Sequence, residues 1–134
     1  MTRVVLAAAL TAIGIASAFA QQPGTRPQFT GTSTVMDGKD LSAARRSFDA
    51  AARTYWHSHD NGQLLLVEKG TMRVQKRGEK MRELTVGESD YTGPNVVHWH
   101  GAGPTEPLVQ INVGFGGGSK WFEAVTDDQY NGKR

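Results

Sequence analysis

The chain has no cysteine among its 134 residues. Disulfide bonds, thiolate metal ligands and cysteine nucleophiles are therefore excluded. The net charge is also small, because 15 Lys and Arg residues are set against 13 Asp and Glu residues, which gives +2. The basic residues are scattered rather than clustered, so we expect no nucleic-acid partner. The length allows one domain, since two independent hydrophobic cores would not fit in it.

Long apolar runs are scarce, and the one clear run lies at the start of the chain. Arg3 precedes it, residues 4–15 form it, and Ala18-Phe19-Ala20 follows with the pattern of a signal-peptidase site. This order predicts that residues 1–20 are a cleaved signal peptide and that the mature protein is periplasmic or secreted. The run is short for a membrane span, so we expect no membrane contact after cleavage. The alternatives are a membrane anchor and an N-terminal core helix.

Helical periodicity is absent before the C-terminal tail, whereas glycine is abundant, with 16 residues. Turn signals recur roughly every eight to twelve residues, which is typical of all-β sandwiches and barrels. We therefore predict an all-β domain over residues 29–130, between a polar leader at 21–28 and a tail at 131–134. The expected strands cover residues 29–36, 46–48, 63–68, 71–76, 82–86, 90–92, 96–100 and 108–113, and a short helix or strand is expected within 121–130.

All four histidines lie in two short motifs, His57-Ser58-His59 and His98-Trp99-His100. In a strand the side chains at i and i+2 share a face, so each motif can direct two imidazoles to one point. If the two strands are neighbours, three or four imidazoles meet inside the barrel. Neutral imidazole is a common ligand of divalent transition metals. The pattern predicts a metal site, with ordinary surface or hydrogen-bonding histidines as the alternative.

Gln63 is the third element of this predicted site. It follows His59 by four residues and opens an apolar run. A polar side chain that enters a buried strand needs a partner, which a metal ion would supply to the amide oxygen.

The order of these residues resembles the two sequence motifs of the cupin family, whose members are jelly-roll β-barrels. The first motif is matched by His57, His59, Gln63 and Gly70 at the family spacing, with glutamine in the position of the usual glutamate. The second motif is matched more loosely over residues 87–98. The resemblance implies a cupin barrel.

Within that family, the chain is similar to small single-domain cupins that use glutamine as the fourth metal ligand. Residues 56–63, 73–75, 98–102 and 121–130 carry this similarity. The group includes manganese-dependent bacterial hydroxynitrile lyases and cupins associated with carboxymuconolactone decarboxylases. The resemblance implies one divalent ion, manganese first, with iron, nickel, cobalt and zinc as alternatives. The ligands that it implies are His57, His59, Gln63 and His98.

The same resemblance implies roles for residues around the ion and for the assembly. His100 and Thr54 would lie on the substrate side as the catalytic residues. We expect a homodimer, because a domain with a small apolar content gains stability from an interface and because an N-terminal strand crosses between barrels in related cupins. Residues 29–35 are the candidate crossing strand.

Three further residues, Arg46, Phe48 and Gln110, are candidates for binding the substrate. Gln110 stands where the hydroxynitrile lyases have a cavity histidine, whereas Gly114, which is not a candidate, stands where they have glutamine. Arg46 shares a strand face with Phe48, so both are expected to point inward, although Arg46 could instead extend to solvent at the barrel mouth. An inward Arg46 would favour a carboxylate or phosphate substrate.

Two classes of function fit these features. The first is a small metal-dependent enzyme, because three His and one Gln are neutral and leave the ion its full charge as a Lewis acid. Its small-molecule reaction could be cleavage of a hydroxynitrile, enolisation or dioxygenation, each with His100 as acid or base. The second class is a binding or sensing module without turnover.

Overall fold

The computed structural model describes residues 30–133. The expected signal peptide at 1–20 and leader at 21–28 lie outside this part of the chain. All the strands and the short helix belong to a compact unit that begins at Met36. The elements are β1 (Ser42–Phe48), β2 (His57–His59), β3 (Gln63–Lys69), β4 (Met72–Lys76), β5 (Arg82–Leu84), β6 (Ser89–Thr92), β7 (His98–Ala102), β8 (Leu108–Gly114), β9 (Ser119–Trp121) and α1 (Asp127–Tyr130).

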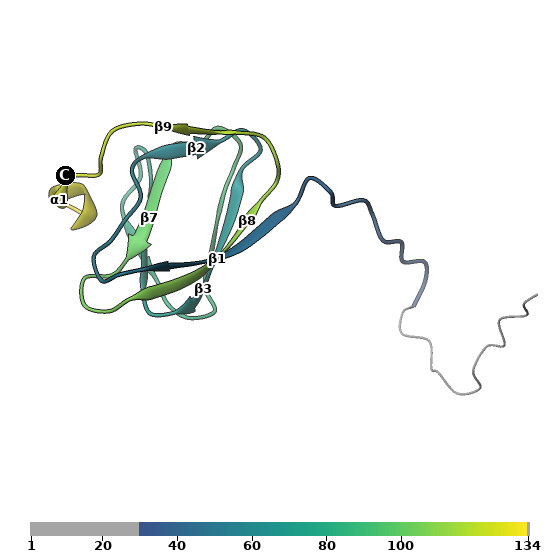
Figure 1. The fold of residues 1–134 in the computed structure, drawn as a ribbon, viewed down its shortest axis with the longest axis horizontal. Coiled ribbons are helices and arrows are strands. Elements are labelled where there is room, and N and C mark those ends of the chain that lie inside the picture. The colour runs from purple at the N-terminus through teal and green to yellow at the C-terminus, as the bar shows by residue number, and fades with distance from the viewer. Residues whose placement is uncertain (1–29, 134) are drawn as a thin grey trace, which may run out of the picture. The chain divides into compact units, whose positions relative to one another are not determined.

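The strands form two antiparallel sheets that surround one interior (Figure 1). One sheet has the order β1-β8-β3-β6, and the other has the order β5-β4-β7-β2-β9. The second sheet brings β2 beside β7, although about 40 residues separate them in the sequence. The two histidine motifs therefore lie on neighbouring strands of one sheet, which is the condition for their imidazoles to meet inside the barrel.

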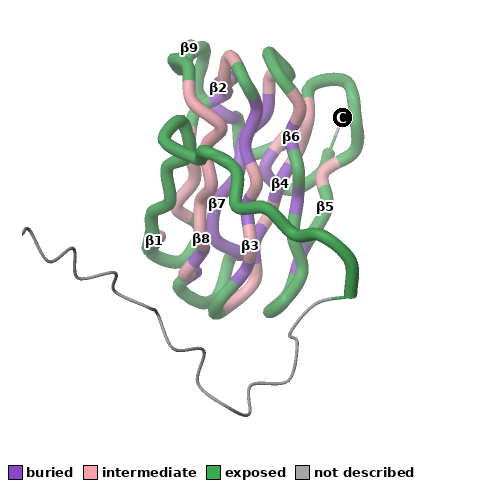
Figure 2. The backbone as a smooth tube through the Cα atoms, turned by 90° about the vertical axis from the view of Figure 1, so that its right-hand side faces the viewer, coloured by how far each residue is buried: buried purple, intermediate pink, exposed green. Residues whose placement is uncertain are grey.

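Strand alternation divides the side chains between the barrel interior and its outer surface. In β3, Gln63, Leu65 and Val67 are buried at every second position. Leu65 and Val67 join the inward side chains of other strands in the inner hydrophobic core, where each fully buried Leu or Val stabilises the fold by about 1.5–3 kcal/mol. Figure 2 shows burial along β3, β4, β6 and β7, whereas β1 and β9 are mostly exposed. The core comprises Leu65, Val67, Met72, Val74, Leu84, Ala102 and Leu108.

A second hydrophobic cluster lies on the outer face of the β7 sheet. Trp99 alternates with His98 and His100, so its side chain faces away from them and packs with Trp56, Val125 and Tyr130. The Tyr130 hydroxyl also donates a hydrogen bond to the carbonyl of Ala102. This outer cluster attaches the C-terminal segment to the strand that carries two of the histidines.

The predicted all-β class is confirmed, and most expected strands are present with ends that shift by at most four residues. Residues 30–36 are an exception, because they form no strand within the described chain and β1 begins only at Ser42. Val96 and Val97 also lie outside a strand, because the turn before them includes Asn95 with a positive φ of 59° and delays β7 to His98. The tail forms both a strand, β9, and a helical turn, α1.

Among the described residues, no helix has the length and apolar character that crossing a membrane requires.

Candidate metal centre and cavity

The four imidazoles gather at one end of the barrel interior. His57 on β2 pairs with His98 on β7, and their ring centroids are 4.3 Å apart. His57 also lies 5.0 Å from His59 and 5.3 Å from His100, centroid to centroid. The predicted convergence of the two His-x-His motifs is therefore present, with His57 in contact with all three of the others.

Two of the rings are oriented by backbone carbonyls. His57 Nδ1 lies 2.9 Å from the carbonyl oxygen of Tyr55, and His98 Nδ1 lies 3.2 Å from that of Val96. A carbonyl only accepts, so each Nδ1 carries the proton and each Nε2 presents a lone pair. Fixing the tautomer from the far nitrogen in this way is the usual support for a metal-binding histidine.

Gln63 meets this arrangement from β3. Its Oε1 lies 3.2 Å from His98 Nε2. With the proton of His98 on Nδ1, the Nε2 lone pair and the amide of Gln63 face each other. A cation bound by both Nε2 and Oε1 would fit this contact, which agrees with the predicted ligand role of Gln63.

His59 and His100 contribute two buried nitrogen atoms without hydrogen-bond partners among the described residues, His59 Nε2 and His100 Nδ1. A buried polar atom without a partner costs about 1–3 kcal/mol. His59 Nδ1 lies 2.8 Å from Ser119 Oγ, so this ring is held by a side chain while its Nε2 stays free. The unpartnered Nε2 of His59 is the second observation that fits a metal ion, whereas the unpartnered Nδ1 of His100 fits either an ion or a proton.

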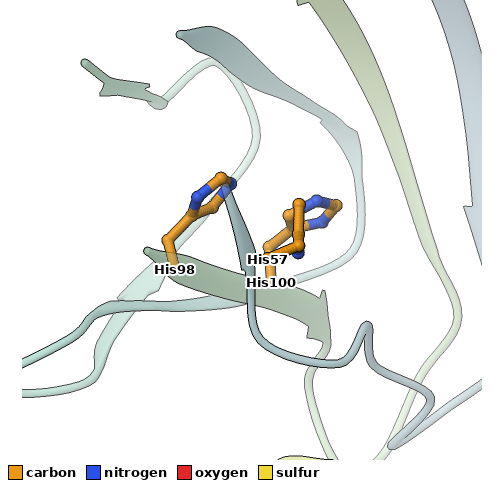
Figure 3. A group of neighbouring side chains, drawn as sticks. All are labelled: His57, His98 and His100. Carbon is orange, nitrogen blue, oxygen red and sulfur yellow. The ribbon is translucent and has the colours of Figure 1, made fainter. Parts of the chain in front are cut away.

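The described part of the chain offers one group of three residues with ligand atoms close enough to share a metal ion. His57, His98 and His100 have ligand nitrogens that all lie within 4.8 Å of one another, and Figure 3 shows these three side chains together. The ligand set implied by the family resemblance shares His57 and His98 with this group but uses His59 and Gln63 in place of His100. The structure therefore groups His57, His98 and His100, and it places Gln63 against His98 and the ring of His59 beside that of His57.

Every histidine of the centre is held in its neutral form. Burial lowers the pKa of His57 to about 4 and that of His98 to about 3, and repulsion from His59 on the first and from His57 on the second adds to the effect. Burial also lowers the pKa of His59, and it holds the pKa of His100 well below its usual value. Neutral imidazoles are the protonation state that metal binding and proton acceptance both require.

A cavity of about 270 Å³ adjoins the histidines. Of the expected catalytic and substrate-binding residues, it is lined by His100, Thr54, Arg46 and Phe48, as well as by His57, His59 and Gln63. The ring of Phe48 packs edge-on against His100, with 5.8 Å between the centroids. The backbone N–H of His100 donates to Thr54 Oγ1 (3.1 Å), and the backbone N–H of Thr54 donates to the His100 carbonyl (2.9 Å). Thr54 therefore supports the strand that holds His100.

Gln110 lies on the inward face of β8 opposite Arg46, but it is fully buried and does not line this cavity. Its Nε2 donates to Asn112 Oδ1 (2.6 Å), and Asn112 does line the cavity. The side chain of Gln110 also lies close enough to His100 to raise the pKa of that imidazole, against the larger lowering by burial. Gln110 therefore adjoins the site, and its predicted role in binding the substrate stays a prediction.

Three lining residues were not predicted: Asn112, Ser119 and Trp121. Asn112 could have been found, because it lies two positions after Gln110 and shares its face. Trp121 and Ser119 carry no such signal, because their positions depend on the pairing of β9 with β2, which sets Trp121 opposite His57 and Ser119 opposite His59. The ring of Trp121 stacks on that of His57 at 4.6 Å between centroids.

Two antiparallel sheets that enclose the paired His-x-His motifs define a β-barrel of the jelly-roll class, with three histidines positioned to bind a metal ion. More specifically, residues 45–114 match the family described as "Cupin domain". The chain belongs to the cupin family.

Similar proteins are known among both characterised sequences and solved structures. The chain is 34% identical over 116 residues to an (R)-mandelonitrile lyase from Granulicella tundricola, an alignment that covers 80% of this chain and 88% of the lyase. It is 39% identical to a cupin-like protein from Thermotoga maritima, whose crystal structure matches with a TM-score of 0.67 over 70% of this chain and 74% of that one. A DMSP lyase from Ruegeria pomeroyi, 15% identical, has a TM-score of 0.54 over 67% of this chain and 44% of its own, and it shows the fold alone.

Proposed function

We propose that the chain is a metal-dependent enzyme that acts on a small hydroxylated molecule, with chemistry of the hydroxynitrile-lyase type. The observation that carries this proposal is the environment of His100. It is a buried, neutral imidazole beside a cavity and three other histidines, and its Nδ1 has no partner within the described chain. The similarity to a mandelonitrile lyase supports the type of chemistry.

The hydrogen-bond pattern separates the proposed ligands from the proposed base. His57, His98 and His59 each have Nδ1 tethered, to two carbonyls and to one hydroxyl respectively, and each keeps Nε2 for an ion. No hydrogen bond among the described residues tethers Nδ1 of His100. We therefore assign the metal to His57, His59, Gln63 and His98, and leave His100 free to accept a proton.

The ion would supply Lewis acidity toward a substrate oxygen, and manganese is our first choice, with iron, nickel, cobalt and zinc as alternatives. All four proposed ligands are neutral, so they would leave the full ionic charge available. His100 would take the proton of the substrate hydroxyl on an imidazole nitrogen, while Thr54 fixes its backbone and Phe48 packs against its ring.

For a hydroxynitrile the proposed reaction balances with this one base. The O–H bond breaks and its proton passes to His100. The bond between the hydroxyl carbon and the nitrile carbon then breaks, the electron pair leaves with cyanide, and a carbonyl product forms. Cyanide takes the proton back from the imidazolium and leaves as hydrogen cyanide. Gln110 and Gly114 differ from the residues that the resemblance leads one to expect at those positions, so enolisation or dioxygenation of another substrate stays an alternative.

The test combines metal analysis with one substitution. Protein purified without a histidine tag is analysed for metal, reloaded with manganese, and assayed for benzaldehyde release from mandelonitrile. We expect about one ion per chain, and we expect His100→Ala to keep the ion while it loses turnover by about 10²–10⁴-fold. Thr54→Ser retains the hydroxyl that accepts a hydrogen bond from the backbone N–H of His100. It is therefore the conservative control with which His100→Ala is compared. Loss of metal from His100→Ala as readily as from His98→Ala would make His100 a ligand, and full metal binding without turnover of any substrate would favour a binding or sensing module.

We also propose that the mature chain begins after Ala20, is periplasmic or secreted, and forms a homodimer through residues 29–35. Val35 supports the dimer, because it is an apolar side chain with 97% of its surface exposed. Apolar side chains that are this exposed gain stability when a second copy covers them.

A further inference from the structure

Arg46 lies on the inward face of β1, beside the candidate metal centre. The strand register sets it opposite Gln110, and it sets Phe48 opposite Leu108, both of which are fully buried inward residues of β8. The side chain of Arg46 lines the same cavity as His57, His59 and His100, although much of the residue stays exposed at the mouth. A cation therefore stands at the entrance of a cavity that is otherwise lined by neutral groups.

The neighbouring residue provides a comparison within the same strand. Arg45 faces the outer surface, where its Nε and Nη2 donate to the two carboxylate oxygens of Glu68 (2.5 and 2.9 Å). Arg46 has no such ion pair with any described residue. Its planar fork of donors is therefore available for a carboxylate from outside the chain.

Asn112 supplies a second donor at the same place. It is two residues beyond Gln110 on the inward face of β8, diagonal to Arg46 across the strand pair, and it lines the cavity with Arg46. Because Gln110 Nε2 donates to Asn112 Oδ1, the acceptor end of the Asn112 amide is occupied. The NH₂ end of Asn112 is then the end left to donate to a ligand.

The charges around the cavity favour the same kind of ligand. Among the described residues that line it, none is acidic. Arg46 is thus the charged group of the lining, and an anion that binds there meets no opposing carboxylate.

We propose that the substrate or ligand of this cavity carries a carboxylate, which Arg46 binds through its guanidinium and Asn112 through its amide NH₂. This assignment rests on the proposed function for the hydroxyl end of the molecule, which would face His100. A nitrile offers no anionic group to Arg46, so the preferred molecule would carry a carboxylate in addition to the hydroxyl that faces His100. A volume of about 270 Å³ fits a small hydroxy acid.

The test compares acids with their uncharged amides. Binding of glycolate, lactate and mandelate, and of the matching amides, is measured by calorimetry on both metal-stripped and manganese-loaded protein. The metal-stripped arm removes direct chelation of an ion by the acids. Each acid and its amide share size and hydroxyl group, so their ratio of dissociation constants isolates the negative charge. We expect at least one acid to bind about 10- to 100-fold more tightly than its amide in both arms, the effect of charge-assisted hydrogen bonds.

Three variants test which residue causes the preference for an acid over its amide. Arg46→Gln should abolish it, and Asn112→Asp should abolish it as well, because an isosteric carboxylate replaces the donor with a negative charge. Arg45→Gln is the matched control, since it removes an arginine one position away on the outer surface and should retain the preference. Equal binding of every acid and amide, absence of binding by all the acids, or a preference that survives Arg46→Gln would overturn the proposal.

The mandelonitrile assay, run in parallel, separates this inference from the proposed function. Turnover without any preference for acids would refute the carboxylate site and leave the lyase function in place. A preference for acids that depends on Arg46, without turnover, would support the carboxylate site and count against the lyase function.

Discussion

Acidification of the metal-free protein should destabilise it over the range in which free histidine titrates. Burial lowers the pKa of His57 from 6.5 to about 4, and that of His98 from 6.5 to about 3. Both side chains are almost fully buried, with 1% and 0% of their surface exposed. The unfolded chain therefore binds protons at a pH where the folded chain does not, so the free energy of unfolding falls as the pH falls.

The sign and the size follow from these values. The stabilisation is complete above pH 6.5, where both states are neutral, and it is lost progressively as the pH falls toward the folded-state pKa near 4. For His57 the difference between 6.5 and about 4 corresponds to roughly 3 kcal/mol. The slope approaches about 1.4 kcal/mol per pH unit for each histidine that stays neutral in the folded state. A stability of about 5–15 kcal/mol would be reduced substantially by pH 5.

Urea unfolding in the presence of EDTA, followed by tryptophan fluorescence at pH 8, 7, 6 and 5, measures this effect. We expect little change from pH 8 to 7 and a fall of at least about 1 kcal/mol between pH 6 and 5. His57→Gln removes one titrating ring. It should lower the slope of the free energy of unfolding against pH in that interval by about 1.4 kcal/mol per pH unit, the contribution of one proton. A free energy of unfolding that stays constant from pH 8 to 5 would refute the conclusion that these imidazoles are buried and neutral.

Three further predictions concern the ligands, the strand that carries His100, and the termini. His59→Ala should lose stoichiometric metal and the increase in melting temperature that metal gives, and unchanged metal content would remove His59 from the ligand set. Gly101→Ala should destabilise the fold by about 1–3 kcal/mol, because the added Cβ would overlap the backbone of Ala52 and Arg53, whereas Gly93→Ala meets only a side-chain atom at 3.9 Å and should cost far less. Protein recovered from the periplasm should begin at Gln21 by mass spectrometry. It should have the mass of a dimer by light scattering, and a monomer at micromolar concentration would contradict the crossing strand proposed at residues 29–35.

The alternation of side chains along strands made the centre of the site predictable. His57 and His59, like His98 and His100, had to share a face once their segments were extended, and the structure pairs His57 directly with His98. Arg46 could be placed inward by the same reasoning, because it shares a face with Phe48. These predictions depend on period two within a strand and on nothing beyond the local sequence.

The parts that were missed depend on pairing between distant segments. Trp121 lies opposite His57 only because β9 pairs with β2, and no residue in the tail encodes that register locally. Residues 30–36 have the composition of a strand but find no partner strand within the described chain, since strand propensity describes fit to a sheet and not a preference of the isolated backbone. The hydrogen bond from Gln110 Nε2 to Asn112 Oδ1 was also missed, because a contact between side chains is not visible in spacing alone. The substrate-binding role of Gln110 stays a prediction.

The charges of the site bear on which small molecule it accepts. With a divalent ion at the neutral histidines and Gln63, the cavity would combine that ion with the Arg46 guanidinium, and no acidic residue lines it within the described chain. Two cationic groups so placed repel each other, and an anion bound between them would relieve the repulsion. An uncharged hydroxynitrile would leave Arg46 in the solvent, which its exposure permits. Added salt should therefore weaken the binding of a carboxylate and leave that of a hydroxynitrile nearly unchanged, so the salt dependence of KM distinguishes the two kinds of substrate even when both are turned over.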